Sequence, residues 1–220
     1  MNTLVIAPHP DDETLGVGGT LFRRKADGGK LAWLIVTCMS PDLGYSDPQI
    51  EERNDQIKKI TKLYGFDSVY ELNFPSTTLD LIPISELIQS ISSVFKIFEP
   101  EEVFCPHYSD VHTDHQIVFK AVSSCTKWFR MPFIKTVLSY ETPSETEFSL
   151  IQAQAFIPNF FVDISPYLED KLKALQIYSQ EIKDFPFPRS IELIRSLALL
   201  RGSNSGFYSA EGFMLLMHRD

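Results

Sequence analysis

The sequence predicts an α/β protein whose mostly parallel sheet carries helices on both faces. Short apolar segments alternate with longer segments of helical periodicity from the first residues onward, which is the pattern of repeated βαβ units. The segment Leu31–Cys38 is apolar along nearly its whole length, as expected for a strand that is covered on both sides. Hydrophobic residues make up 44% of the 220 residues, so the chain can bury one sizeable core.

The first half of the chain alternates regularly between the two kinds of element. The expected strands are Thr3–Ala7, Leu31–Cys38, Ser68–Leu72 and Glu102–Cys105, and the expected helices are Thr14–Asp27, Gln49–Tyr64, Ile84–Phe98 and Asp114–Thr126. Glycine or proline follows three of these helices, at Gly28, Gly65 and Pro100, and such residues typically end a helix. Loops are expected at Pro41–Pro48 and Pro75–Pro83.

The second half is less regular. Strands are expected at Lys135–Tyr140, Asn159–Asp163 and Gly212–His218, with a helix at Pro166–Lys183. The segment from Asp184 fits an irregular connection followed by a helix from Ser190. Because no repeat or linker divides the chain, we expect a single domain over residues 1–220. The sequence leaves the oligomeric state open and is compatible with a homo-oligomer.

Composition and charge limit the class of function. A formal net charge of −9 argues against nucleic acid as a partner, because phosphate binding needs a basic surface. No apolar stretch approaches the roughly 18 residues of a membrane span, and Leu4–Ala7 is too short for a signal peptide. Cys38, Cys105 and Cys125 form no CxxC pair and are expected to be reduced. We therefore expect a cytoplasmic protein without a transmembrane segment.

Four of the five histidines fall in two short polar clusters, and each cluster directly follows a predicted strand. The first cluster is Ala7–Glu13 (Ala-Pro-His-Pro-Asp-Asp-Glu), and the second is Pro106–His115. Segments that follow parallel strands emerge at one carboxyl edge of the sheet, where ligand crevices form at the reversal of strand order. Two clusters far apart in the sequence can therefore share one crevice.

The two clusters together offer a set of metal ligands. His9 and Asp12 lie three residues apart in a turn constrained by Pro10, and His115 can join them from the second cluster. Two nitrogens, one carboxylate oxygen and an open position suit a single catalytic Zn²⁺ ion. Such an ion lowers the pKa of its bound water to about 7 and so supplies hydroxide at neutral pH.

The clusters hold more acid–base groups than a metal needs. Asp11 can accept a proton from the zinc-bound water. His112 lies three residues before His115, so one ring can bind metal while the other faces the substrate. We expect Asp114 to hold the His112 ring and favour its protonated form, as an oxyanion stabiliser or general acid. These are the groups required for metal-assisted acyl hydrolysis.

Several neighbouring residues have a plain structural interpretation. Glu13 fits either stabilisation of a helix N-terminus or support of the site. His107 fits either a structural hydrogen bond or a site role, and His218 is expected to be structural. The glycines of Gly16–Gly19 lack the GxGxxG spacing of a dinucleotide site and indicate close helix packing instead.

Two of these segments resemble the signature motifs of a known family. Pro8–Glu13 and His112–His115 resemble those of the LmbE-like, or PIG-L, N-deacetylases, which include N-acetylglucosaminyl-phosphatidylinositol de-N-acetylases. Tyr178–Gln180 and Ala210–Phe213 resemble two later, weaker elements of the family. The resemblance implies a Rossmann-like three-layer sandwich, the LmbE-like deacetylase fold, and an N-acetylglucosamine-type substrate.

The resemblance also implies a role for individual residues. By position, the resemblance makes His9, Asp12 and His115 the zinc ligands and Asp11 the general base. It makes His112 the residue that faces the oxyanion, oriented by Asp114. These roles agree with those proposed above. The resemblance further implies that Arg53 binds substrate. Asp110 stands where some members carry a tyrosine that contacts the reacting carbonyl, so we place it on the substrate side. Gln56 replaces an acidic residue that many members have.

These observations predict a zinc-dependent hydrolase that removes the N-acetyl group from a small-molecule amino-sugar derivative. An amidase for another amide, such as a thiol-sugar conjugate, is the nearest alternative. A phosphoesterase would need a second metal ion, held among the four aspartates of the two clusters. A sugar-binding domain with a purely structural zinc would not need the additional acid–base groups.

Overall fold

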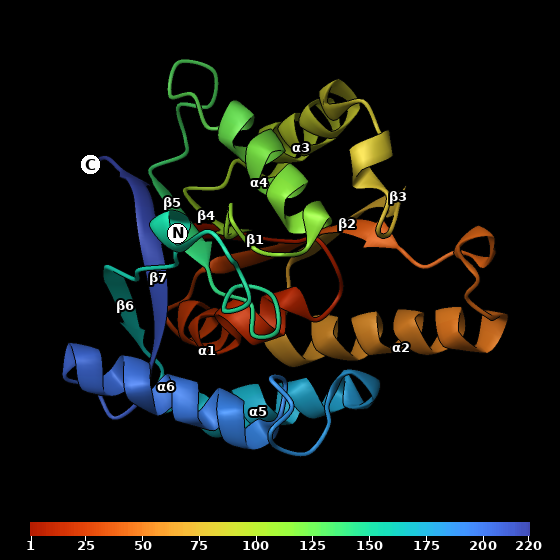
Figure 1. The fold of residues 1–220 in the computed structure, drawn as a ribbon. Helices are drawn as coiled ribbons and strands as arrows, with labels where there is room; N and C mark the ends of the chain where they lie inside the picture. Colours follow the sequence, from red (N-terminus) through yellow and green to blue (C-terminus); the bar gives the residue numbers. More distant parts are fainter.

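A seven-stranded sheet forms the centre of the molecule, with helices packed on both of its faces (Figure 1). The computed structural model describes residues 1–220. The strands are β1 (Asn2–Ala7), β2 (Lys30–Cys38), β3 (Ser68–Pro75), β4 (Glu102–Pro106), β5 (Thr136–Tyr140), β6 (Phe160–Asp163) and β7 (Ala210–His218). This arrangement confirms the predicted fold class.

The strand order is β3-β2-β1-β4-β5-β7-β6. The first five strands in this order pair in parallel, and β7 pairs antiparallel with both β5 and β6. The chain moves outward from β1 through β2 to β3 and then returns to place β4 on the other side of β1. The reversal of strand order therefore lies between β1 and β4, where an α/β sheet opens a crevice at its carboxyl edge.

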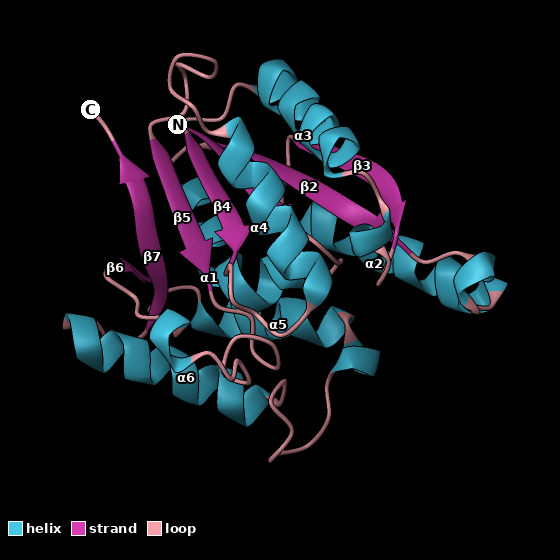
Figure 2. Ribbon diagram, turned by 45° about the horizontal axis from the view of Figure 1, so that its top comes forward, coloured by secondary structure: helices cyan, strands magenta, loops and turns pink.

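The helices divide between the two faces of the sheet, as Figure 2 shows. Helices α3 (Ile84–Phe98) and α4 (Thr113–Cys125) pack together on one face. The other face carries α1 (Asp12–Ala26), α2 (Asp47–Tyr64), α5 (Leu168–Ile177) and α6 (Ile191–Ser205). Short 3₁₀ turns lie at Pro41–Leu43, Leu79–Leu81, Gln152–Gln154 and Ser179–Glu181. No helix combines the length and apolar character needed to cross a membrane.

Each face of the sheet has its own apolar core. In β1, Val5 and Ala7 belong to the cluster under α1, whereas Leu4 and Ile6 belong to the cluster under α3 and α4. Side chains alternate between the faces of a strand, so a strand buried on both faces must be apolar throughout. This explains the nearly continuous apolar run that the sequence shows in β2.

The expected helix at Pro166–Lys183 differs most from the structure. Helix α5 ends at Ile177, and a separate 3₁₀ turn follows at Ser179–Glu181. The chain leaves helical geometry at Tyr178, whose fully buried hydroxyl donates a hydrogen bond to Glu13. Tyr178 is thus tied to the loop after β1, and the 3₁₀ turn that follows it faces the site.

Candidate metal-dependent active site

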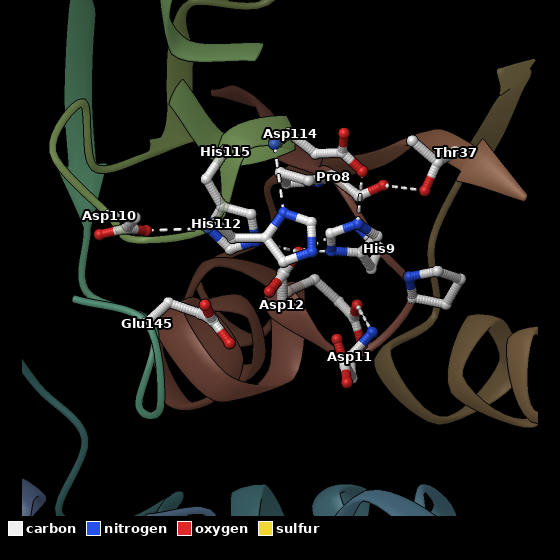
Figure 3. Close-up of polar contacts among 12 residues, drawn as sticks. Pro8, His9, Asp11, Asp12, Thr37, Asp110, His112, Asp114, His115 and Glu145 are labelled. Carbon is white, nitrogen blue, oxygen red and sulfur yellow. Dashed lines mark hydrogen bonds and ion pairs between the residues drawn. The ribbon is translucent and has the colours of Figure 1, made fainter. Parts of the chain in front are cut away.

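The two histidine clusters meet at the crevice between β1 and β4. The first cluster forms the turn between β1 and α1, and the second forms the loop between β4 and α4. Figure 3 shows His9, His112 and His115 turned toward one another, with Asp12 beside them. The three ring centroids lie 4.5–5.4 Å apart. The fold therefore brings together all three histidines that the sequence placed in the site.

His9, Asp12 and His115 form a compact group of possible metal ligands. One ligand atom from each lies within 4.8 Å of the other two. Asp12 Oδ2 is 3.5 Å from His9 Nδ1 and 3.3 Å from His115 Nε2. Asp12 and His115 are each only 1% exposed, while the His9 side chain is 20% exposed toward the cleft. A second, overlapping group of His9, His112 and Asp114 satisfies the same distance limit.

A carboxylate holds the remaining nitrogen of each of the two expected ligand rings. Asp110 Oδ2 lies 2.9 Å from His115 Nδ1, and Asp114 Oδ2 lies 3.0 Å from His9 Nε2. In metal sites such a carboxylate fixes the ring and its tautomer and leaves the opposite nitrogen free for the metal. Here the opposite nitrogens, His115 Nε2 and His9 Nδ1, both face Asp12.

The residues present fit a divalent ion at this position. Asp12 Oδ1 is buried and has no hydrogen-bond partner, which is costly for a carboxylate oxygen unless something else satisfies it. Its partners His115 and His9 hold the pKa of Asp12 well below the usual range against the effect of burial. An ionised carboxylate with two imidazole nitrogens is a donor set that zinc binds.

The pKa values of His9 and His115 without a metal ion show that this pocket favours positive charge. Burial alone would lower the pKa of His9, but hydrogen bonds with Asp114 and Asp12 raise it to about 9. Burial opposes protonation of His115 too, and Asp12 together with Asp110 raises its pKa to about 10. In the metal-free protein both rings therefore carry a proton at neutral pH, and a cation that binds must displace it.

Asp11 occupies a constrained position next to the metal ligands. Its backbone has φ 138°, a sparsely populated region for a residue other than glycine, and its amide donates to the buried Glu13 carboxylate at 3.0 Å. Its own carboxylate accepts a hydrogen bond from Arg189 Nη1 at 2.8 Å. Burial raises the pKa of Asp11 to about 6, although Arg189 opposes the rise. The group therefore remains ionised at neutral pH and can accept a proton.

His112 is held differently from the sequence-based expectation. The backbone amide of Asp114 donates to His112 Nδ1 at 3.1 Å, so this nitrogen is unprotonated and Nε2 carries the hydrogen. Burial, together with the neighbouring His9 and His115, lowers the pKa of His112 to about 4. The prediction that Asp114 keeps this ring protonated is thus corrected: His112 is a neutral ring with an N–H donor.

The structure also relocates the side chains of Asp110 and Asp114. Asp110 is fully buried, with one oxygen on His115 and the other accepting from Thr146 Oγ1 at 2.7 Å. Asp110 does not line the cleft. Its position therefore does not support the expected contact with substrate. The Asp114 carboxylate accepts from His9 and from the amide of Thr77 at 2.7 Å. Both aspartates therefore hold the ring nitrogens that face away from Asp12.

A cleft of about 380 Å³ opens beside the metal pocket. Its walls include His9, Asp11 and His112 from the two histidine clusters, together with Tyr45 and Arg53. The residues lining the rest are Pro10, Ile35, Thr37, Cys38, Met39, Ile50, Asn54, Ile57, Glu71, Asn73, Ser76, Thr77, Glu181 and Arg189. The volume is within the range of small-molecule sites, and both predicted loops after β2 and β3 contribute to it.

Arg53 lines this cleft, and its substrate-binding role stays a prediction; two other cleft residues were not foreseen. Arg53 donates to the carbonyl of Pro10 at 2.6 Å and stacks over the Tyr178 ring at 5.6 Å. Glu181 falls within the expected helix Pro166–Lys183, which in the structure gives way to the 3₁₀ turn at Ser179–Glu181, and Arg189 lies in the irregular connection from Asp184. Their only sequence signal was closeness to the Tyr178–Gln180 element that the family resemblance pointed to.

The remaining motif residues have structural roles. Glu13 accepts hydrogen bonds from Asp11, Thr14 and Tyr178, and burial raises its pKa to about 8. The His107 ring contacts the Gln154 carbonyl and Ser109. Close packing explains the glycine run, since a Cβ on Gly16 would lie 2.3 Å from the Tyr140 ring.

Comparison with known proteins identifies the family of this chain. The family model described as GlcNAc-PI de-N-acetylase (PIG-L) matches residues 4–126. Diacetylchitobiose deacetylase of Thermococcus kodakarensis is 27% identical over 95% of this chain and 80% of its own length. A probable N-acetyl-alpha-D-glucosaminyl L-malate deacetylase 2 of Bacillus anthracis is 24% identical over 82% of this chain and 81% of its own. The crystal structure of a conserved protein of Thermus thermophilus superposes with a TM-score of 0.78 at 25% identity, covering 99% and 96% of the two chains.

Proposed function

The chain belongs to the PIG-L family, and we propose that it is a zinc-dependent hydrolase that removes the N-acetyl group from an N-acetylglucosamine-type sugar derivative. Two of the relatives named above are described as deacetylases of such compounds, which supports hydrolysis of an N-acetyl amide bond. The observation that carries the proposal is the convergence of His9, Asp12 and His115 beside a cleft that also holds Asp11 and His112.

His9, Asp12 and His115 would hold one zinc ion, with Asp110 and Asp114 fixing the two rings. When bound, zinc lowers the pKa of a coordinated water to about 7 and polarises the amide carbonyl. The Asp12 carboxylate would supply the oxygen ligand, because its Oδ2 faces both rings and its buried Oδ1 has no hydrogen-bond partner in the protein.

Two residues would move or stabilise charge during the reaction. Asp11 is ionised at neutral pH and borders the cleft, so it would accept the proton of the attacking water and pass it to the leaving amine. His112 presents a neutral N–H donor to the same cleft. It would donate a hydrogen bond to the oxygen that becomes negative as the carbonyl carbon turns tetrahedral.

The test is release of free amine from a panel of N-acetylglucosamine derivatives, including N,N′-diacetylchitobiose, by the zinc-loaded protein. We expect amine and acetate to appear in equal amounts with the wild type and to vanish with His115→Ala. Larger acids in place of acetate would favour an amidase for another acyl group. No amine from any member, with one zinc bound per chain, would refute the proposed substrate class.

A further inference from the structure

Two arginines that line the cleft are joined by one glutamate. Glu181 Oε1 accepts from Arg53 Nη2 at 2.5 Å, and its Oε2 lies 3.6 Å from Arg189 Nη1. The Arg53 side chain is 9% exposed, that of Arg189 16% and that of Glu181 32%. We name these three residues the arginine bridge.

Both guanidinium groups have further acceptors. Arg53 donates to the Pro10 carbonyl, and Arg189 donates to Asp11 at 2.8 Å and lies 3.4 Å from Glu145. Hydrogen-bond donors of both guanidinium groups are thus already committed within the protein. Neither guanidinium group is therefore free to bind a phosphate or a carboxylate, which arginine otherwise binds through its paired N–H groups.

The charge balance of the cleft points the same way. Outside the metal pocket, where a bound zinc ion would add positive charge, the charged lining consists of Arg53, Arg189, Asp11, Glu71 and Glu181, so three carboxylates face two guanidinium groups there. An anionic ligand would have to displace Glu181 or lie beside these carboxylates, and like charges at close range in a partly buried site repel strongly. The hydroxyl groups of a sugar can instead donate charge-assisted hydrogen bonds to the carboxylates.

We propose that Glu181 determines specificity by neutralising the arginine pair, so that the cleft selects uncharged amino-sugar glycosides over amino sugars that bear a phosphate or carboxylate. This inference rests on the proposed function and narrows its substrate class. It also gives the 3₁₀ turn after Tyr178 a role in substrate choice.

The experiment compares three ligands of the zinc-loaded protein: methyl N-acetyl-β-glucosaminide, N-acetylglucosamine 1-phosphate and N-acetylglucosamine 6-phosphate. The two phosphates place the charge at opposite ends of the sugar. The measurements are kcat/KM from amine release and Kd from calorimetry, for the wild type, Glu181→Gln and Glu169→Gln. Glu169 is the matched control, because it pairs with Arg195 at the surface with 64% of its side chain exposed.

We expect the wild type to prefer the neutral glycoside to both phosphates by about tenfold or more, as close like-charge repulsion would give. Glu181→Gln should narrow this preference at least about threefold, mainly through KM, because it frees both guanidinium groups. Equal or better use of either phosphate by the wild type would overturn the inference, as would identical behaviour of the two variants. If no ligand is hydrolysed, the proposed function fails, while the order of the Kd values still decides this inference; binding of none refutes both.

Discussion

The site consists of two regions that are stabilised in different ways. The inner metal pocket, formed by His9, Asp12 and His115 with Asp110 and Asp114, is almost entirely buried, and each ring has a carboxylate partner. The arginine bridge, which also lines the cleft, is held by ion pairs to Glu181, whose side chain is 32% exposed. Partly exposed ion pairs contribute little to stability, whereas losing a partner inside a buried network is costly. The metal pocket thus suits a fixed reaction, and the arginine bridge suits discrimination among substrates.

Removing an inner ligand should have the largest effect of any substitution in the site. His115→Ala deletes a ring that is 1% exposed and faces Asp12. We expect loss of the bound zinc and a fall in kcat/KM of about a thousandfold or more, since a catalytic metal supplies several kcal/mol of transition-state stabilisation. Elemental analysis of the purified variant, alongside amine release, measures both. Full zinc occupancy in this variant would contradict the ligand assignment.

Asp11→Asn separates proton transfer from metal binding. The amide keeps the size of the side chain and an oxygen that can accept from Arg189, but it cannot take a proton. We expect kcat to fall about 10²- to 10⁴-fold with the zinc content unchanged. Steady-state kinetics and metal analysis on the same preparation test this expectation. Turnover close to that of the wild type would exclude Asp11 as the base.

The affinity of the inner pocket for zinc should rise with pH. In the metal-free protein the pKa of His9 is about 9 and that of His115 about 10, so below these values both rings must lose a proton when the ion binds. Between pH 6 and pH 8 the affinity should therefore increase by up to about a hundredfold per pH unit. It should stop rising above about pH 10. Calorimetry in buffers of different ionisation enthalpy counts the protons released; release of none at neutral pH would disprove the protonated state.

A supporting residue behind the pocket should matter less than a ligand. Asp110→Asn weakens the acceptor on His115 Nδ1, and loss of such a partner typically costs about 10- to 100-fold in metal affinity or activity. Asp55→Asn is the control, because Asp55 is an exposed residue of α2 paired with Lys59. Zinc competition with a chelator measures the difference between the two variants. Equal affinities would show that Asp110 does not orient the ring.

The smallest effect is expected for an aromatic residue of the cleft lining. Tyr45 lines the cleft, and an aromatic contact of this kind contributes about 0.5–1.5 kcal/mol. Tyr45→Ala should therefore raise KM by roughly 2- to 10-fold and change kcat less. A kcat loss as large as that of Asp11→Asn would place Tyr45 in the chemistry and remove the distinction between the two regions.

Sequence reasoning succeeded where a local pattern determines the structure. The apolar strands predicted the sheet, and the histidine clusters after β1 and β4 predicted which loops meet. It failed for partners that depend on the tertiary fold: the buried Asp110 pairs with Thr146, and His112 is held by a backbone amide. Arg189 reaches Asp11 from 178 positions away, which no periodicity reveals. The single domain and the cytoplasmic location stay predictions of the sequence, which leaves the oligomeric state open.

The central claim is that one zinc ion lies among His9, Asp12 and His115, and anomalous diffraction from a zinc-loaded crystal tests it most directly. We predict a single peak bounded by His9 Nδ1, the Asp12 carboxylate and His115 Nε2, with Asp110 and Asp114 still on the opposite ring nitrogens. A peak centred instead among His9, His112 and Asp114, the overlapping group of possible ligands, would contradict the account. It would make His112 a ligand and leave the buried Asp12 oxygen unexplained.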